Sequence, residues 1–296
     1  MEPNLLHQSG RVLFGGSWKV GKTRLTTQLV QALADGKPWL GLFRVPKPQR
    51  VLVVDLDNLP ADHQDLYDGW ADRNQNVIHW LPQQDLWIDR PTDFARLQEQ
   101  IECHRPDVIL YDCYYRLVSF SENDEEAVKT LFLPRLNRLT QENGVAHILI
   151  HHMRKPSKDY KGKAIEQDAA DIGGHRSLMN WSYSILALVE PIPNRLKLKL
   201  QLRKDRIDDL DLTRNPEDGY FSVTDPGQVS YSAILTKLNE FGNQLPQKDL
   251  HSLLQLPDRT MRWALNKLES EGKIEVTQEG RRNIIKAVIK AKAATL

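Results

Sequence analysis

The chain has 296 residues, 40% of them hydrophobic and 27% charged, which is enough for one large and one small domain with buried cores. The 40 Lys and Arg residues nearly balance the 39 Asp and Glu residues, so the net charge of +1 argues neither for nor against a polyanionic partner. The sequence has no apolar run near the ~18 residues of a membrane span, no signal-peptide pattern, and no metal-ligand or disulfide spacing between Cys103 and Cys113. We therefore expect a soluble cytoplasmic protein with no membrane partner.

Strands and helices are predicted to alternate along the first two thirds of the chain. Apolar, β-branched runs predict strands at residues 11–16, 50–57, 77–81, 106–112 and 145–152, and helical spacing covers residues 22–36, 91–105 and 124–144. Thr92 is the expected N-cap of the second helix, Gly36 ends the first, and Pro134 must kink or divide the third. This alternation predicts an α/β fold with a mainly parallel sheet covered by helices on both faces.

The pattern changes after residue 152. Residues 153–176 are polar and lysine-rich and are expected to form a long loop; strands are expected at 183–190, 195–204 and 219–224. The turn at 225–228 is the expected boundary between a domain of residues 1–225 and a domain of residues 226–296. In the second domain, three helical patterns precede two strand-like segments, at 273–278 and 282–290. That layout predicts a small winged helix-turn-helix domain.

Residues 16–23, GSWKVGKT, fit the phosphate-loop pattern GxxxxGK[ST] between a predicted strand and a predicted helix. Glycines let backbone N–H groups approach phosphate oxygens, and the helix N-terminus favours negative charge. Lys22 is expected to reach the β- and γ-phosphates of ATP and Thr23 to ligate Mg²⁺. Lys19 would touch phosphate, touch a neighbouring subunit, or be solvated. The nucleotide-binding residues expected from this pattern are Gly16, Ser17, Trp18, Lys19, Val20, Gly21, Lys22, Thr23 and Arg24.

Polar residues lie at the ends of three of the predicted strands. Asp112 would hold Mg²⁺ through water, or else cap the following turn. Either Asp55 or Asp57 would orient or deprotonate the attacking water, although Asp57 would equally well cap a helix beginning near residue 60. His151 and His152 would contact the γ-phosphate or be bonded to backbone; zinc is not expected here, because no further ligands accompany the pair in the sequence.

The ordered set of the phosphate loop, LVVDLDN, VILYDC, LIHHMRK and LRKDR resembles the RecA-like ATPases over roughly residues 5–225. Within that class the chain looks most like the RepA-type hexameric replicative helicases of plasmids and phages. The resemblance implies that Asp57 stands at the position of a catalytic glutamate, one methylene shorter, and that His152 matches the γ-phosphate sensor. It also implies that Lys204 and Arg206 reach the γ-phosphate of a neighbouring subunit, and therefore an oligomer, typically a hexameric ring. A solvated strand end is the alternative for this pair.

Basic residues in two places are candidates for contact with DNA. The resemblance places a loop that holds single-stranded DNA at Arg154, Lys155, Lys158, Lys161 and Lys163, where lysines would neutralise phosphates without sequence preference; a merely solvated loop is the alternative. In the expected winged helix, the candidate contacts are Arg259, Arg262, Lys267, Arg281 and Arg282. Winged helices also serve as protein–protein modules, so that reading stays open.

The sequence leaves three functions open. The first is an ATP-driven DNA motor, a helicase or single-stranded DNA translocase in the replication or mobilisation of a plasmid, phage or other mobile element. The second is an ATP-switched DNA-binding regulator or loader that uses the winged helix and does not unwind DNA. The third is a recombinase or repair filament protein, which is less well supported because no polymerisation segment is evident before residue 16.

Overall fold

The computed structural model describes residues 1, 5–58, 74–80, 85–157, 160, 165–192, 195–203, 209–224, 234–254, 258–280 and 282–288, with backbone only at 192, 258–260, 263 and 282. The chain divides into two compact units, Met1–Val223 and Thr224–Leu296. The boundary predicted at 225–226 lies outside the described residues. In the part of the chain that is described, no helix is both long enough and apolar enough to cross a membrane.

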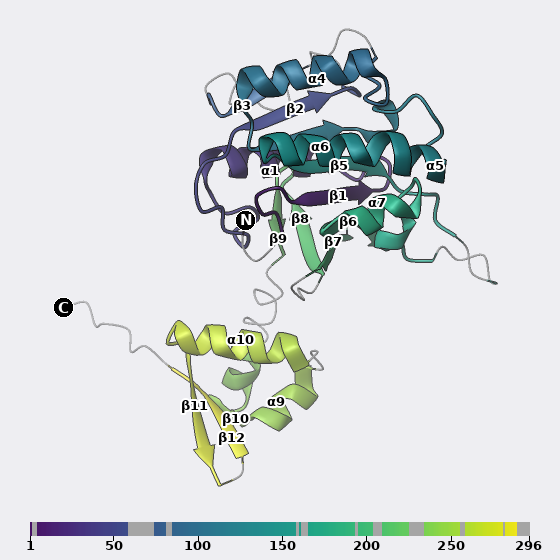
Figure 1. Ribbon diagram of the computed structural model, residues 1–296. Helices are drawn as coiled ribbons and strands as arrows, with labels where there is room; N and C mark the ends of the chain where they lie inside the picture. Colours follow the sequence, from purple (N-terminus) through teal and green to yellow (C-terminus); the bar gives the residue numbers. More distant parts are fainter. Residues whose placement is uncertain are drawn as a thin grey trace. The chain divides into compact units, whose positions relative to one another are not determined.

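The first unit is built on a nine-stranded sheet in the order β3-β2-β4-β5-β1-β6-β7-β8-β9 (Figure 1). All neighbouring pairs from β3 to β6 are parallel, and β6 to β9 are antiparallel. The predicted α/β fold with a mainly parallel sheet is therefore confirmed. The strands are β1 Arg11–Gly16, β2 Val51–Asp55, β3 Val77–Trp80, β4 Val108–Asp112, β5 Ala146–His152, β6 Ser184–Ile192, β7 Arg195–Leu202, β8 Leu210–Arg214 and β9 Phe221–Val223.

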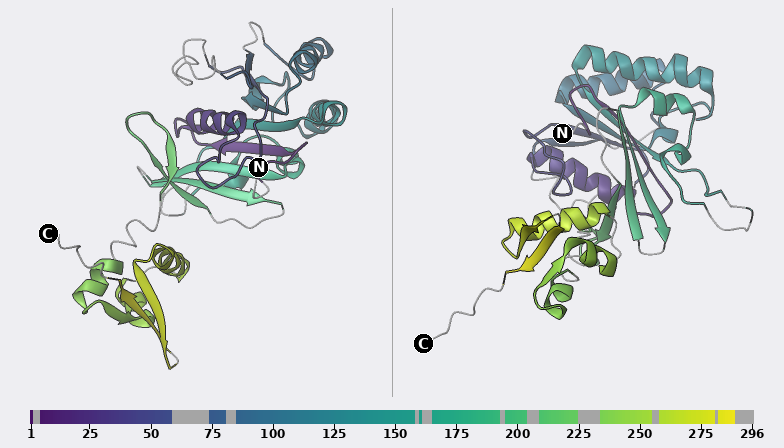
Figure 2. Two further views of the ribbon diagram at one scale, coloured as in Figure 1. Left: turned by 90° about the vertical axis from the view of Figure 1, so that its left-hand side faces the viewer. Right: turned by 90° about the horizontal axis from the view of Figure 1, so that it is seen from below.

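Helices cover both faces of the parallel strands (Figures 1 and 2). The helix α1 (Lys22–Asp35) packs its buried leucines against one face, which continues over β7 to β9. The helices α4 (Pro91–His104), α6 (Leu133–Asn143) and α7 (Arg176–Trp181) cover the other face. Because β2 and β4 are buried along their whole length, their near-continuous apolar sequences are what two covered faces require.

The antiparallel strands bring the far edge of the sheet back to α1. The Gln28 side-chain amide donates to the Phe221 carbonyl at 3.0 Å and accepts from the Phe221 N–H at 2.8 Å. The Tyr220 hydroxyl lies within hydrogen-bond distance of the Gln31 amide, and the Phe221 ring is buried in the core that α1 shares. Residues nearly 200 positions apart are thus joined directly to the first helix.

Several local expectations need correction. Arg90, not Thr92, is the N-cap of α4, because Pro91 occupies the first helical turn, where its missing N–H costs nothing. Pro134 does divide the third helical segment: Glu125–Ala127 (α5) is α-helical, Val128–Phe132 forms a π-helical turn, and α6 begins at Leu133. The strand β8 and the helix α7 were not expected from the sequence.

The segment expected as a long loop is anchored at both ends. Met153 and Ile172 form an isolated antiparallel bridge, and the Arg154 N–H donates to the Asp171 carbonyl at 2.7 Å. A 3₁₀ turn at Ala169–Asp171 precedes Ile172, whose side chain lies directly under Gly15 of β1. A Cβ atom at Gly15 would come within 2.3 Å of the Ile172 side chain, so the end of this segment packs against the strand that leads into the phosphate loop.

The second unit contains helical residues at 234–240, then β10 (Gln244–Pro246), α9 (Gln247–Leu254), α10 (Asp258–Ser270), β11 (Ile274–Glu279) and β12 (Arg282–Ala287). Its sheet has the order β10-β12-β11, with antiparallel pairing throughout. Leu250, Met261, Leu265 and Ile285 belong to its separate hydrophobic core. The helices and the two final strands lie where the sequence places them; the winged-helix assignment itself stays a prediction.

Candidate active site

The phosphate-loop residues run from the end of β1 into the first turn of α1. Gly21 is the N-cap of α1, with φ of 101°, a left-handed conformation that a residue with a Cβ rarely adopts. A Cβ there would also meet the Phe221 ring at 2.7 Å. The helix has no side-chain cap and no acidic residue in its first turn, so its positive end is not neutralised locally. This is the electrostatic environment that an anionic group prefers.

Lys22 is folded back over the loop. Its ammonium donates to the carbonyls of Gly16 and Ser17, at 2.9 and 2.8 Å, and the side chain is buried. A Cβ at Gly16 would lie 2.6 Å from Lys22 Cγ, so this path of the lysine requires glycine at position 16. Burial lowers the pKa of the Lys22 ammonium, and Asp112, Cys113 and Asp57 oppose that shift. Carboxylates from two other strands therefore act on the lysine of the phosphate loop.

The acidic residues come from adjacent strand ends and have different surroundings. Asp55 and Asp112 are register partners at the ends of β2 and β4, and both are buried. The Asp55 carboxylate accepts from the N–H groups of Asp57 and Asn58 and from the Asn58 amide, so Asp55 holds the turn that follows β2. The Asp55 carboxylate therefore holds the turn after β2, and the assignment of Asp57 to the attacking water stays a prediction.

Asp57 faces groups that follow β4. Its carboxylate accepts a hydrogen bond from the Tyr115 hydroxyl at 3.0 Å and lies 3.2 Å from Arg116 Nε. Ligand atoms of Asp57, Cys113 and His152 all lie within 4.8 Å of one another. The expectation that no further metal-type ligands accompany the histidine pair is therefore wrong: sequence spacing did not reveal that Cys113 and Asp57 come together beside His152.

The two adjacent histidines have different roles in the packing. His151 is buried, stacks edge-on against Tyr114, and lies 3.4 Å from Glu122; burial lowers its pKa to about 3. His152 is half-buried beside Tyr115, and its pKa is lowered by burial and by Lys22 and raised by Asp57. Lys22 lowers the pKa of both histidines, but of the two only His152, the predicted sensor, also lies beside the Asp57 carboxylate.

Trp18 and Lys19, which the motif leaves free, contact each other. Trp18 is 77% exposed, and the Lys19 ammonium lies 4.2 Å from the centre of its ring. Lys19 has φ of 58°, so its backbone forms a left-handed turn at the exposed tip of the phosphate loop. Arg24, the last predicted nucleotide-binding residue, places its guanidinium 5.6 Å from the centre of the Tyr220 ring. Tyr220 and Phe221 are site neighbours that the local sequence pattern did not indicate.

A buried glutamine connects the phosphate loop with the segment after β5. Gln167 accepts from the Ser17 hydroxyl at 2.9 Å and donates to the Arg154 carbonyl at 2.6 Å. The oxygen of the Gln167 amide thus bonds to the phosphate loop, and its nitrogen bonds to the segment after β5. The sequence offered no signal for Gln167, because the contact spans 150 positions and belongs to no motif.

The residues predicted to contact DNA or a neighbouring subunit are only partly described by the structure. Lys155 is exposed at the start of the lysine-rich residues 153–176 (the basic segment), and Arg262 and Lys267 are exposed on α10, where Lys267 pairs with Glu271. Outside the described residues lie Lys158, Lys161, Lys163, Lys204, Arg206 and Arg281, and outside the described side chains lie Arg259 and Arg282.

These features fit a nucleoside triphosphate with Mg²⁺. The helix end without a cap, the glycines at 16 and 21 and the folded Lys22 are suited to a polyphosphate. Thr23, as the second residue of α1, and Asp112, at the end of β4, offer the oxygen ligands that Mg²⁺ requires. The residues that would hold the two groups are thus brought to one edge of the sheet.

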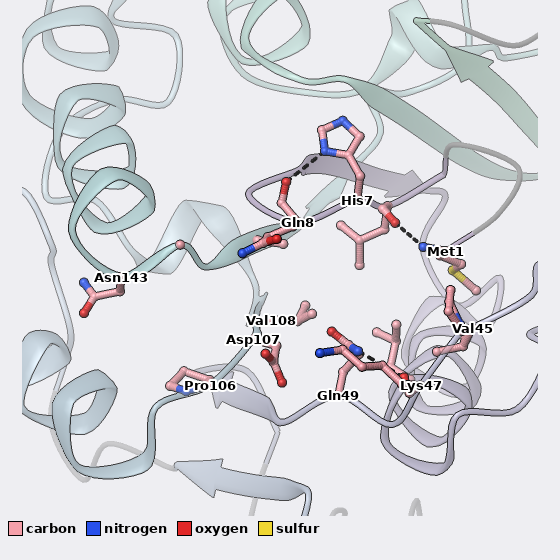
Figure 3. A pocket seen from close by; sticks show the side chains of 15 residues that line it. Met1, His7, Gln8, Val45, Lys47, Gln49, Pro106, Asp107, Val108 and Asn143 are labelled. Atoms are coloured by element: carbon pink, nitrogen blue, oxygen red, sulfur yellow. Dashed lines mark hydrogen bonds between the residues drawn. The ribbon is translucent and has the colours of Figure 1, made fainter.

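A separate cavity of about 280 Å³ lies at the opposite ends of the parallel strands (Figure 3). Gln8 precedes β1, Gln49 precedes β2, Asp107 precedes β4, and Asn143 and Gly144 precede β5. Because the phosphate loop follows the carboxyl end of β1, this cavity does not belong to the candidate active site.

Comparison with known proteins agrees with this geometry. The model of the AAA_25 family, an AAA domain, matches residues 1–158, more than half of the chain. A crystal structure of a KaiC-like protein from the hyperthermophilic archaeon Pyrococcus horikoshii OT3 has a similar fold, with a TM-score of 0.50 and 12% identity over 74% of this chain and 93% of that one. No curated protein sequence matches. The chain has a RecA-like fold and is a P-loop ATPase that belongs to the AAA_25 family.

Proposed function

We propose that the chain is an oligomeric, ATP-driven DNA motor, a RepA-like helicase or single-stranded DNA translocase acting in the replication or mobilisation of a plasmid, phage or other mobile element. The observation that carries the proposal is the Gln167 bridge between Ser17 of the phosphate loop and Arg154 at the start of the basic segment. Through it, a change at the nucleotide site alters a hydrogen bond of the segment that would hold DNA.

The composition of that segment supports single-stranded DNA as its ligand. Lys155 is exposed, and Tyr160, in the same segment, is 91% exposed. Lysines neutralise phosphates, and exposed aromatic rings stack on bases of any sequence. A basic segment with an exposed tyrosine is therefore suited to a strand whose bases are unpaired.

Each residue of the candidate active site would have its own role in ATP hydrolysis. ATP supplies the γ-phosphoryl group, and Mg²⁺ neutralises charge on its oxygens. Lys22 would turn from the Gly16 and Ser17 carbonyls to phosphate oxygens, while Thr23 and Asp112 would hold the cation. Asp57 would orient the attacking water, and His152 would sense the γ-phosphate. Lys204 and Arg206 would act on the γ-phosphate of a neighbouring subunit, which makes a ring, typically a hexamer, the active form.

ATP hydrolysis with and without single-stranded DNA tests the motor. We expect strong stimulation by DNA in the native chain and no hydrolysis in Lys22→Ala. The double variant Lys155→Ala/Tyr160→Ala should keep its basal rate but lose stimulation, because stacking on one aromatic ring contributes about 1–3 kcal/mol per base. Its matched control is Lys37→Ala/Leu42→Ala, which removes an exposed cation and an exposed apolar side chain elsewhere on the same unit. Equal loss of stimulation in both double variants would contradict the assignment.

Mixing two inactive variants tests the shared site. Lys22→Ala subunits keep Arg206, and Arg206→Ala subunits keep Lys22, so a mixed oligomer contains some intact interfaces. We expect the mixture to recover part of the ATPase activity that each variant lacks alone. Mass measurement with ATP and single-stranded DNA gives the number of subunits. A monomer, or a mixture as inactive as its components, would contradict the oligomeric site.

The alternative is an ATP-switched DNA-binding regulator or loader without unwinding activity. The observation that favours it is α10, which buries Met261, Leu265 and Leu268 and exposes Arg262 and Lys267. An amphipathic helix with cations on its outer side is suited to a DNA groove. Duplex binding that is lost in Arg262→Ala/Lys267→Ala but kept in Lys155→Ala/Tyr160→Ala would favour the regulator over the motor.

A further inference from the structure

Three different metal-ligating side chains meet beside the phosphate loop. Asp57 follows β2, Cys113 follows β4, and His152 ends β5, and these strands are neighbours in the sheet. Because the carboxyl ends of parallel strands lie at one edge, the three residues come together although 95 positions separate the first from the last. Their ligand atoms lie within 4.8 Å of one another.

The chemistry of these donors differs from that of the Mg²⁺ ligands. A carboxylate oxygen, an imidazole nitrogen and a thiolate sulfur together are suited to Zn²⁺, whereas Mg²⁺ prefers oxygen alone. Zn–S bonds of about 2.3 Å and Zn–N or Zn–O bonds of about 2.0 Å place ligands of a tetrahedral site roughly 3.5 Å apart. Since the three ligand atoms lie within 4.8 Å of one another, they need to approach one another by up to about 1.3 Å, which side-chain rotation supplies.

The carboxylates around the cluster favour a cation, whereas Arg116 and Lys22 oppose one. The Asp57 carboxylate is oriented by the Tyr115 hydroxyl at 3.0 Å, the kind of outer contact that fixes metal ligands. The carboxylates of Asp55 and Asp112 act on the Cys113 thiol together with Asp57, while Arg116 opposes them. When Cys113 ligates the cation, the proton of its thiol leaves to solvent.

We propose that Asp57, Cys113 and His152 form a binding site for a thiophilic divalent cation, Zn²⁺ or one of its class, separate from the Thr23 and Asp112 ligands of Mg²⁺. Three protein ligands leave the fourth position of the cation for water. The occupied site also withdraws the Asp57 carboxylate from the attacking water, so that hydrolysis stops while nucleotide stays bound. This second consequence rests on the function proposed for Asp57; the binding of the cation does not.

Co²⁺ titration of the full-length chain tests the site, because a Co²⁺–thiolate bond gives a charge-transfer absorption band in the near ultraviolet. The chain contains two cysteines, which offers a matched pair of variants. Cys103 is exposed on α4, away from the three residues. We expect one band per chain in the native protein and in Cys103→Ser, no band in Cys113→Ser, and competition by Zn²⁺. For His152→Ala we expect a Co²⁺ affinity at least about 10-fold lower, since even an outer-contact change costs that much.

Several outcomes overturn the inference. One is the absence of a band in native protein whose circular dichroism shows it folded; another is a band that disappears in Cys103→Ser and persists in Cys113→Ser. Circular dichroism is measured for each variant. If Cys113→Ser does not fold, Cys113→Ala and the native spectrum decide.

ATPase assays then separate the binding of the cation from its effect on Asp57. A native band with hydrolysis unaffected by Zn²⁺ would contradict the role of Asp57 but keep the site, whereas inhibition equal in native and Cys113→Ser protein would place the Zn²⁺ effect elsewhere.

Discussion

The parallel and antiparallel halves of the nine-stranded sheet carry different kinds of residue. The parallel half, from β3 to β6, ends in the phosphate loop, Asp55, Asp112 and His152, all at the carboxyl ends of strands. The antiparallel half, from β7 to β9, contributes Tyr220 and Phe221, which reach α1 through hydrogen bonds and ring contacts. The parallel half carries the polar side chains of the candidate active site. The antiparallel half holds α1 in place, and α1 carries Lys22, one of those side chains.

This difference has a topological cause. Parallel strands present all their carboxyl ends at one edge, so polar residues from distant sequence positions meet there. Antiparallel strands alternate in direction and cannot collect groups in this way, but their last strand can return to an element formed early in the chain. We therefore expect substitutions in the parallel half to affect catalysis, and substitutions in the antiparallel half to act through stability and nucleotide affinity.

The largest expected effect comes from an aspartate in the parallel half. Asp112→Asn removes the negative charge of a proposed Mg²⁺ ligand, and we expect kcat to fall by about 10²- to 10³-fold with little change in folding, as for loss of a preorganised charge contact. The matched control is Asp211→Asn, which changes an exposed aspartate on the antiparallel strand β8. Steady-state ATP hydrolysis measures both. A similar fall of kcat in the two variants would show that the parallel half is not specifically required for catalysis.

Acid sensitivity is the next largest effect and also belongs to the parallel half, since β6 to β9 contain no histidine. Burial lowers the pKa of His147 and of His151 to about 3, against about 6.5 in the unfolded chain. Below pH 6.5 the unfolded chain takes up protons that the folded chain does not. Each histidine therefore lowers the free energy of unfolding by about 1.4 kcal/mol per pH unit as pH falls from 6.5 toward 3, or about 4 kcal/mol for both at pH 5.

Urea denaturation at pH 7 and pH 5 checks this expectation. In His147→Gln the pH slope should decrease by about 1.4 kcal/mol per unit, because one of the two groups is gone. The glutamine amide keeps a partner for Tyr111 and Thr140, which contact the His147 ring at 3.2 and 3.0 Å. An unchanged slope would show that His147 takes up a proton in the folded chain.

The antiparallel half is tested by Phe221→Ala. Loss of this buried ring should lower the free energy of unfolding by about 3 kcal/mol. Because the ring contacts Gly21 at the start of α1, we also expect weaker nucleotide binding. Phe43→Ala, in the same core, provides the control: a similar loss of stability with unchanged affinity for ATP. Calorimetric titration and chemical denaturation separate the two effects, and unchanged affinity in Phe221→Ala would show that β9 only stabilises the unit.

The smallest expected effect concerns a charge pair between β7 and the segment before the 3₁₀ turn. Lys199 Nζ lies 2.8 Å from a carboxylate oxygen of Glu166, which is about half exposed. Lys199→Ala should lower the free energy of unfolding by less than about 1 kcal/mol, because water screens such pairs. ATP hydrolysis should not change. A loss of several kcal/mol would mean that the antiparallel half holds the basic segment more firmly than its geometry indicates.

Sequence patterns predicted the parts of the molecule that depend on local periodicity. The buried strands β2, β4 and β5, the phosphate loop and the end of α1 at Gly36 follow from apolar runs and glycine positions. The polar residues after these strands were also predicted, because parallel topology brings strand ends together. Cys113, Gln167 and Phe221 were not predicted as site residues. Each acts through a contact with a distant segment, and no local spacing encodes such a contact.

The bridge between Met153 and Ile172 has a consequence for loop-closure entropy. The two bridge partners are 19 positions apart in the chain, so bringing them together costs entropy when the unit folds. The packing of Ile172 under Gly15 and the hydrogen bonds of Gln167 offset that cost within the unit. A ligand that binds between the two partners would therefore not have to supply the free energy for bringing them together.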